Sequence, residues 1–184
     1  MLPKTTALLL IDAQKAWDDP YWGQRNNPGA EANIAALAAA FRAQELPVVH
    51  VAHDARDPNS PLFPGESGHG FKPEATPLPG EAVFHKSAHS AFVGTGLEAY
   101  LRDRGIDRLV LAGFTTDRCV SSTARLSCDL GFKTVVVRDA CAAFELEDMD
   151  GSRIPAQVLH DTGLTVLHGE YAMVLPTEAI LQLL

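Results

Sequence analysis

The chain has 184 residues, of which 46% are hydrophobic and 21% are charged, and its formal net charge is −8. This composition is typical of a globular protein and argues against a disordered, collagen-like or coiled-coil chain. The sequence has no basic cluster and no apolar run long enough to cross a membrane, so neither nucleic acid nor a membrane is an expected partner. The length suits a single domain, residues 1–184. The sequence has no signal-peptide pattern and no paired set of cysteines, which predicts a cytoplasmic protein.

Strand-like and helix-like segments alternate along the chain. Short apolar runs suit strands that are buried on both faces, and apolar residues at helical spacing suit amphipathic helices. A stretch with six prolines and four glycines is expected to be a long surface loop. In chain order we predict strand Thr6–Ile11, helix Glu31–Gln44, strand Pro47–Ala52, loop Arg56–Gly80, strand Ala82–Lys86, helix Gly96–Arg104, strand Arg108–Gly113, helix Cys119–Leu130, strand Lys133–Val137, helix Ser152–Thr162, strand Leu164–Leu167 and helix Thr177–Leu184.

This alternation predicts an α/β fold. We expect a three-layer α-β-α sandwich around a mainly parallel, roughly six-stranded, Rossmann-like sheet. In such sheets the functional site lies beyond the carboxyl ends of the strands, near the point where the strand order reverses. The candidate site residues are therefore those that follow a predicted strand: Asp12, His53, Asp54, Lys86, residues 115–119 and Asp139.

Cys119 is the cysteine whose position favours chemistry. It opens a predicted helix, where free N–H groups and the helix dipole can lower the pKa of a thiol and can bind an oxyanion. Cys128 lies in the middle of that helix and Cys141 follows a strand, so neither has this setting. A lone cysteine is more often a small buried residue, and position alone leaves both interpretations open.

Asp12 and Lys86 each come at the end of a predicted strand. Taken singly, Asp12 could cap a turn and Lys86 could be a solvated surface residue. The carboxyl ends of parallel strands meet at one edge of a sheet, so we expect both side chains to lie near Cys119. A carboxylate base, a cation that stabilises a thiolate and a thiol together make a nucleophilic set.

Five segments in order along the chain carry a family resemblance: Ala7–Gln14, His85–Phe92, Leu111–Val120, Gly131–Ala142 and His168–Ala172. With these segments the chain resembles the isochorismatase-like cysteine hydrolases. That superfamily includes nicotinamidases and enzymes similar to N-carbamoylsarcosine amidase, ureidoacrylate amidohydrolase and streptothricin hydrolase. Isochorismatases proper lack the cysteine, so its presence here favours amide chemistry over vinyl-ether cleavage.

The resemblance implies a catalytic triad of Asp12, Lys86 and Cys119. It also implies a cis peptide bond between Phe114 and Thr115, which would aim a backbone N–H, together with that of Cys119, at the oxyanion. The implied reaction is cleavage of an amide, ureido or lactam C–N bond of a small molecule through a thioester. The resemblance further implies a homo-oligomer, either a dimer or a tetramer.

Nicotinamidases bind a metal after the second strand through an Asp-x-His pair and a later histidine. Here the aligned residues are Asp54-Ala55-Arg56, so an arginine stands where the first histidine would be, although His69 could match the later one. We therefore predict no metal and no other cofactor. A metal-assisted, nicotinamidase-type amidase is kept as an alternative.

Substrate contacts are expected from aromatic and polar residues near the predicted strand ends. Small-molecule pockets are typically lined by aromatic side chains, and an arginine beside the nucleophile could bind a carboxylate. Each of these residues could instead pack a loop or lie on the surface. Two other interpretations stay open, namely a non-catalytic scaffold of the same fold and a redox-active thiol protein. The predicted contacts are Trp17, Trp22, Phe63, His89, Arg118 and Phe144.

Overall fold

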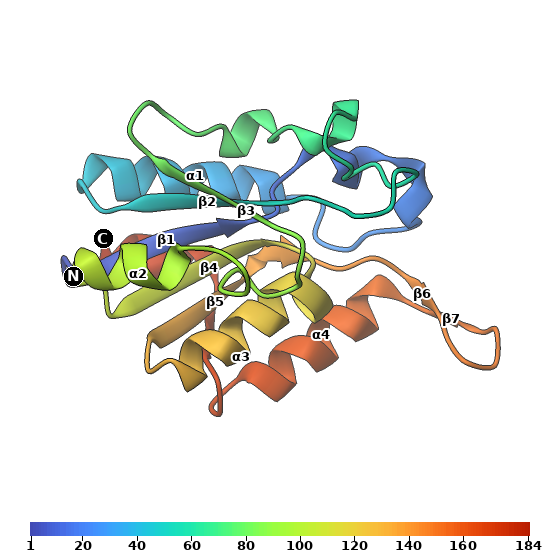
Figure 1. Ribbon diagram of the computed structural model, residues 1–184. Helices are drawn as coiled ribbons and strands as arrows, with labels where there is room; N and C mark the ends of the chain where they lie inside the picture. The colour runs from blue at the N-terminus through green and yellow to red at the C-terminus, as the bar shows by residue number, and fades with distance from the viewer.

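The computed structural model covers residues 1–184 and is built around a six-stranded parallel sheet (Figure 1). Its strand order is β3-β2-β1-β4-β5-β8, so the order reverses between β1 and β4, which pair with each other. This confirms the predicted α/β, Rossmann-like architecture. The strands of this sheet are β1 (Thr6–Ile11), β2 (Val48–His53), β3 (Ala82–Lys86), β4 (Arg108–Phe114), β5 (Lys133–Ala142) and β8 (Met173–Leu175).

Helices cover both faces of the sheet and form the two outer layers (Figure 1). One apolar core lies under α1 (Ala30–Ala43) and α5 (Thr177–Leu183) and includes Leu8 and Leu10 of β1. The other core includes Leu9 and Ile11. It lies under the three remaining helices, which are α2 (Leu97–Asp103), α3 (Ser121–Asp129) and α4 (Ala156–Leu167). Because successive side chains of a strand point to opposite faces, β1 contributes side chains to both cores, and this explains its uninterrupted apolar sequence.

The prediction for the C-terminal region is wrong in two places. Residues 164–167, predicted as the sixth strand, form the last turn of α4, and the sixth strand is Met173–Leu175. Buried residues of α4 recur at positions 156, 160, 164 and 167, which is the spacing of one helical face. The helix also begins later than predicted, because Pro155 precedes it as an extended cap residue and residues 146–154 form a hairpin instead.

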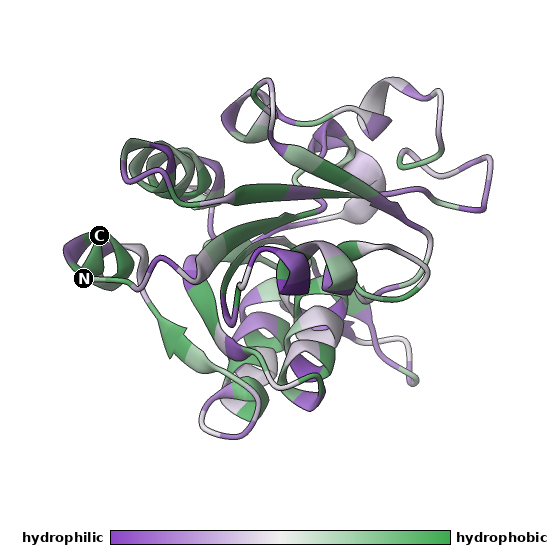
Figure 2. Ribbon diagram, turned by 60° about the vertical axis from the view of Figure 1, so that its left-hand side comes forward, coloured by the Kyte–Doolittle hydropathy of each residue, from purple (hydrophilic) through white to green (hydrophobic).

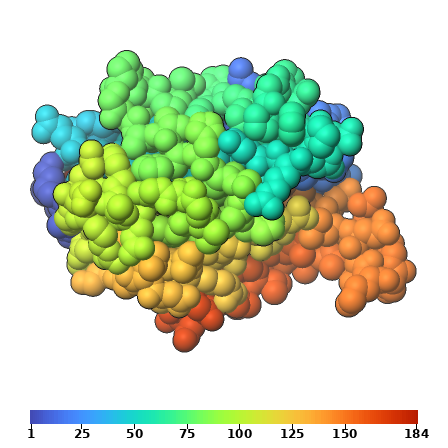
Figure 3. Space-filling view, viewed as in Figure 1, coloured from blue at the N-terminus to red at the C-terminus, as the bar shows by residue number.

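The remaining chain forms short elements around the carboxyl ends of the strands. The hairpin of β6 (Leu146–Glu147) and β7 (Arg153–Ile154) projects from the body of the molecule, as the orange extension in Figure 3 shows. The Pro-rich loop contains two short helical turns, η3 (Ser67–His69) and η4 (Pro73–Ala75). No helix combines the length and the apolar character that a membrane span requires.

Candidate active site

Three strand ends bring the predicted triad together at the reversal point of the sheet. Asp12 directly follows β1, Lys86 is the last residue of β3, and Cys119 follows β4. Cys119 does not open a regular α-helix as predicted, because it lies in a wider helical turn, η5 (Thr116–Val120), that leads into α3. One of the Asp12 carboxylate oxygens, a His53 ring nitrogen and Cys119 Sγ lie within 4.8 Å of one another.

Asp12 and Lys86 form a fully buried ion pair. Lys86 Nζ lies 2.7 Å from Asp12 Oδ2, and neither side chain is exposed to solvent. The other carboxylate oxygen, Oδ1, is buried and has no hydrogen-bond partner. A buried acceptor without a donor is costly, by about 1–3 kcal/mol. We conclude that Lys86 fixes one oxygen of the carboxylate and leaves the other free to accept a proton.

The protonation state of Cys119 differs from the sequence-based expectation of a lowered thiol pKa. Burial raises the pKa of Cys119, and the neighbouring Asp12 carboxylate raises it further, while Lys86 opposes both effects only in part. Burial also raises the pKa of Asp12, against the influence of Lys86. The resting site therefore holds a neutral thiol beside a carboxylate that is a stronger base than a solvated one.

His53, the last residue of β2, also contacts Lys86. Its Nδ1 lies 3.1 Å from Lys86 Nζ. Burial, reinforced by the positive charge of Lys86, lowers the pKa of His53 to about 4, so at neutral pH its imidazole is uncharged and Nδ1 can accept a hydrogen bond from the ammonium. Gln14 fixes this histidine, since its side chain accepts from His53 N–H at 2.8 Å and donates to the His53 carbonyl at 3.2 Å.

Gln14 is a site residue that the sequence reasoning missed. It is fully buried and also donates to the His69 carbonyl at 2.7 Å, so it links the turn after β1 to the end of β2 and to the Pro-rich loop. Its position two residues after Asp12, close to the end of an apolar strand, was the available signal. A buried polar side chain at a strand end needs partners, and here these are backbone groups of the site.

The chain between β4 and Cys119 presents a backbone donor to the site. The Phe114–Thr115 peptide bond is cis, as the family resemblance implies. Thr115 N–H donates no hydrogen bond within the protein, although the residue is buried. Just before it, Gly113 has φ 130° and no room for a side chain, because an added Cβ would lie 1.9 Å from the Ile11 carbonyl oxygen. The close approach of β1 and β4 therefore requires glycine here.

His89 is the one predicted substrate contact that lies directly against the thiol. Its Nδ1 is 3.9 Å from Cys119 Sγ, and its side chain is largely exposed to solvent while Cys119 is buried. His89 thus stands between the nucleophile and bulk water. A group in this position is suited to contact a substrate that reaches Cys119.

The predicted aromatic contacts form one stacked cluster beside the triad. Trp17 stacks on Phe114 at 6.0 Å and on Phe144 at 5.6 Å between ring centroids, and its Nε1 donates to the Asp12 carbonyl. Trp22 lies 4.7 Å from Trp17 and is half-buried. Trp17 and Phe144 are nearly inaccessible, so they shape the wall of the site more than they offer a contact surface. Phe63 forms no part of this cluster and lies half-buried in the Pro-rich loop.

A small cavity of about 20 Å³ adjoins the cis peptide bond, and a wider depression of about 420 Å³ lies outside it. Trp22, Arg118 and Leu146 line both spaces, so the two are neighbours. Thr115 and Asp117 line the inner cavity, and Thr115 Oγ1 and Asp117 Oδ1 are buried without a hydrogen-bond partner. The structure thus places Arg118, Trp22 and Phe144 around a space with unsatisfied polar atoms.

Two histidines and an aspartate form a second cluster at the same edge of the sheet. Asp54 Oδ1 lies 2.7 Å from His69 Nε2 and 2.9 Å from His85 Nδ1, and all three ligand atoms are within 4.8 Å of one another. The sequence comparison with nicotinamidases missed His85, which stands one residue before Lys86 in β3. The premise that a third ligand is missing is therefore wrong, because this donor set suits Zn²⁺, Mn²⁺ or Fe²⁺. The prediction of no metal stays untested.

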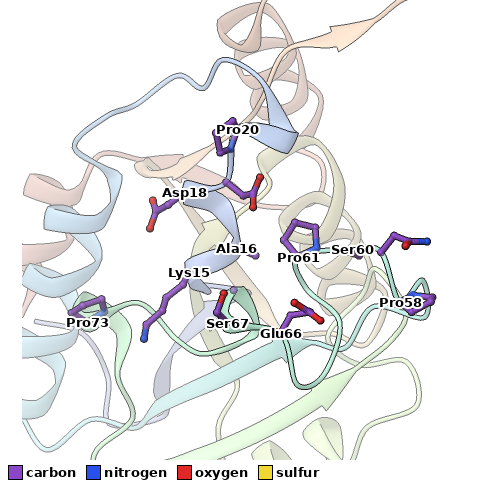
Figure 4. Close-up of a pocket in the computed structure, with 13 residues that line it drawn as sticks. Lys15, Ala16, Asp18, Pro20, Pro58, Ser60, Pro61, Glu66, Ser67 and Pro73 are labelled. Carbon is purple, nitrogen blue, oxygen red and sulfur yellow. The ribbon is translucent and has the colours of Figure 1, made fainter.

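A further cavity, of about 890 Å³, lies between the turn η1 (Lys15–Asp18) and the Pro-rich loop (Figure 4). It is lined mainly by polar side chains and prolines, and none of its 13 lining residues belongs to the triad. Figure 4 shows Lys15, Asp18 and Glu66 among these residues. We do not assign the reaction to this cavity, because Asp12, Lys86 and Cys119 lie outside its lining.

Comparison with known proteins places this architecture in a family. The model of the isochorismatase domain matches residues 6–173. The isochorismatase family protein YrdC of Bacillus subtilis (strain 168) is 37% identical over 175 residues, which cover 95% of this chain and 94% of YrdC. Ureidoacrylate amidohydrolase RutB of Methylobacterium radiotolerans is 29% identical over 75% of this chain and 67% of RutB.

Solved structures agree with this assignment. The crystal structure of a protein from Chromobacterium violaceum ATCC 12472, described as a hydrolase of the isochorismatase family, superposes with a TM-score of 0.94 and is 46% identical. The superposition covers 99% of this chain and 94% of that one. With a family match over nearly the whole chain and close agreement in fold, the protein belongs to the isochorismatase family of hydrolases.

Proposed function

We propose that this protein is a cysteine hydrolase that cleaves a C–N bond of a small amide or ureide through a thioester on Cys119. The observation that carries the proposal is the buried Asp12–Lys86 pair, whose second carboxylate oxygen is free within reach of the thiol. The related RutB proteins are ureidoacrylate amidohydrolases by name, which supports this class of bond. A neutral thiol next to a strengthened base suits a nucleophile that loses its proton only as it attacks.

In the acylation half-reaction, Asp12 Oδ1 takes the thiol proton while Cys119 Sγ bonds to the substrate carbonyl carbon. The negative charge that develops on the carbonyl oxygen is stabilised by the N–H groups of Thr115 and Cys119. The proton on Asp12 then passes to the substrate nitrogen as the C–N bond breaks. Ammonia or an amine leaves, and the acyl group remains on sulfur as a thioester.

In the deacylation half-reaction, Asp12 takes a proton from water as the water oxygen attacks the thioester carbon. The C–S bond breaks, the acid product forms, and the proton on Asp12 returns to sulfur. Lys86 orients Asp12 and favours its ionised form before each proton transfer, and neutral His53 holds Lys86 in place. Each turnover therefore consumes one water and restores the neutral thiol.

We place the part of the substrate that does not react in the small cavity beside the cis peptide bond. Thr115 Oγ1 and Asp117 Oδ1 lack partners there, and Arg118 supplies a cation at its edge. Trp22 and Phe144 provide apolar walls. The small inner volume favours a compact polar group, while the outer depression leaves room for a larger substituent.

The proposal is tested by ammonia release from a panel of small primary amides and ureides, with intact-protein mass spectrometry to detect an acyl adduct. We expect turnover by the wild type, none by Cys119→Ala, and a loss of about 10²- to 10⁴-fold for Asp12→Asn. Cys128→Ala is the matched control and should keep full activity. Turnover that survives Cys119→Ala, or a panel that yields neither ammonia nor adduct, contradicts the proposal.

The cluster of Asp54, His69 and His85 favours one second candidate, a metal-assisted amidase. A bound metal would act as a Lewis acid on a substrate carbonyl or ring nitrogen. Metal content measured on purified protein, before and after chelation, separates the candidates. Stoichiometric Zn, Mn or Fe that is lost in His85→Ala, together with activity that follows metal content, supports this second function. Full activity of the chelated protein contradicts it.

A further inference from the structure

An apolar groove lies at the end of the sheet opposite to the candidate active site. Its volume is about 330 Å³, within the range of small-molecule pockets. All strands of the sheet are parallel, so their amino ends form the floor of this groove while their carboxyl ends carry the triad. The two ends of the chain lie side by side (Figure 2), where Leu2 N–H donates to the Leu183 carbonyl. The groove is lined by Leu2, Thr6, Arg108, Leu109, Val110, Lys133, Thr134, Val135 and Met173.

The apolar part of the groove is a row of side chains across three neighbouring strands. Val110 of β4 pairs with Val135 of β5, which pairs with Met173 of β8, so the three stand side by side on one face. Val135 is half-buried and Met173 is 57% exposed. The helix on this face, α5, has seven residues and leaves Val135 and Met173 partly exposed, whereas Val110 is buried and 1% exposed. The accessible apolar part of the groove is therefore formed by Val135 and Met173.

A row of polar side chains borders this floor. Thr6, Arg108 and Lys133 are register partners at the starts of β1, β4 and β5. Thr6 Oγ1 and Arg108 Nε are buried and have no hydrogen-bond partner, and Thr6 is 1% exposed. Buried polar atoms without partners are rare in folded proteins because each is destabilising. Both residues line the groove, and these two atoms are unused within the chain.

The charge of this row is unusual for the molecule. The chain carries a net charge of −8, yet Arg108 and Lys133 place two cations at one end of an apolar floor. Asp107 Oδ1 forms an ion pair with Arg108 Nε at 3.8 Å, a distance too long for a hydrogen bond. The floor is also rigid, since Thr5 O accepts from Arg108 N–H and Asp107 O accepts from Lys133 N–H.

We propose that this groove binds a small amphipathic monocarboxylate. The ligand carboxylate pairs with the guanidinium of the half-buried Arg108 and with the ammonium of the exposed Lys133. The apolar tail lies along the half-buried Val135 and the exposed Met173. Because the site is at the opposite end of the strands from Cys119, it does not depend on the proposed reaction.

Isothermal titration calorimetry at low ionic strength tests this site with octanoate and 1-octanol. We expect saturable 1:1 binding of octanoate, and about tenfold weaker binding of octanol, which keeps the tail and lacks the charge. Arg108→Gln and Lys133→Gln should each weaken octanoate about tenfold and leave octanol unchanged. Arg104→Gln, an exposed arginine outside the groove, is the matched control and should bind like the wild type.

Two further variants distinguish a ligand site in this groove from binding at the active site and from a contact between two copies of the chain. Val135→Trp, which fills the floor, should abolish binding of both ligands while thermal unfolding shows a folded protein. Cys119→Ala should bind octanoate like the wild type. Absence of saturable octanoate binding, equal affinity for octanoate and octanol, or equal weakening by Arg104→Gln overturns the proposal. A wild-type dimer that binds no octanoate and dissociates on Val135→Trp identifies the groove as an interface between copies, and also overturns it.

Discussion

Replacement of Lys86 by methionine should expose how strongly the buried pair depends on both charges. Lys86 Nζ and Asp12 Oδ2 are 2.7 Å apart with no solvent exposure. At an effective dielectric constant of about 20, this distance corresponds to a direct attraction of about 6 kcal/mol. Removing one partner of a buried pair costs about 3–5 kcal/mol because the other charge stays buried without compensation. We expect Lys86→Met to lower the free energy of unfolding by that amount.

The double variant Asp12→Asn/Lys86→Met separates charge from packing. It leaves no buried charge, so we expect it to recover most of the loss and to unfold within about 1–2 kcal/mol of the wild type. Urea unfolding at pH 7, followed by circular dichroism, measures each free energy, and Lys15→Met, at an exposed lysine, is the control. A loss below about 1 kcal/mol for Lys86→Met, or a double variant as unstable as the single one, refutes this account of the pair.

The pH dependence of Lys86→Met has a defined sign. Burial already raises the pKa of Asp12 in the wild type, and loss of Lys86 removes the main influence that opposes this shift. An acid whose folded pKa lies above its unfolded value stabilises the fold at low pH and loses that contribution as pH rises through the folded pKa. The stability gap between Lys86→Met and the wild type should therefore narrow as the pH falls.

Three further predictions concern residues around the sheet. Burial opposes ionisation of Glu81, but hydrogen bonds from Arg42 and His50 outweigh this effect and lower the pKa of Glu81 to about 2. The free energy of unfolding should therefore fall by about 3 kcal/mol as the pH falls from about 4.5 to 2. The urea midpoint should fall with pH across this range in the wild type and not in Glu81→Gln. An equal change of the midpoint with pH in both proteins contradicts the prediction. Gly113→Ala should cost more than about 3 kcal/mol, because its Cβ would clash with backbone of β1, and a stable variant in chemical denaturation would refute the close approach. His160→Ala removes a buried side chain that bonds Thr116 Oγ1 at 2.8 Å and should cost about 2–3 kcal/mol by the same assay; a change under about 0.5 kcal/mol refutes that role.

The sheet and the meeting of the triad could be predicted because both follow from local patterns. Apolar runs that end in a polar residue locate parallel strands, and parallel strands place their carboxyl ends together. The strand predicted at residues 164–167 is wrong because four consecutive residues with apolar ends fit a strand as well as a buried helical turn. Only the contact with the sheet decides between them.

The electrostatics of the site could not be read from the sequence. The direction of the Cys119 pKa depends on how deeply the thiol is buried and on its distance from Asp12, and neither is a local property. The histidine cluster was missed for a related reason. His85 approaches Asp54 because β2 and β3 pair with Ala52 opposite His85, and this register appears only when the strands are assembled.

A nucleophile that stays protonated at rest has a consequence for how the protein withstands oxidants. Peroxides attack thiolates and react slowly with thiols, and burial limits their access further. The raised pKa and low exposure of Cys119 therefore favour survival of the resting enzyme under oxidative conditions, and Cys141 is likewise buried with a raised pKa of about 12. The half-buried Cys128 is then the thiol that oxidants should modify first, at a position that the proposed reaction does not use.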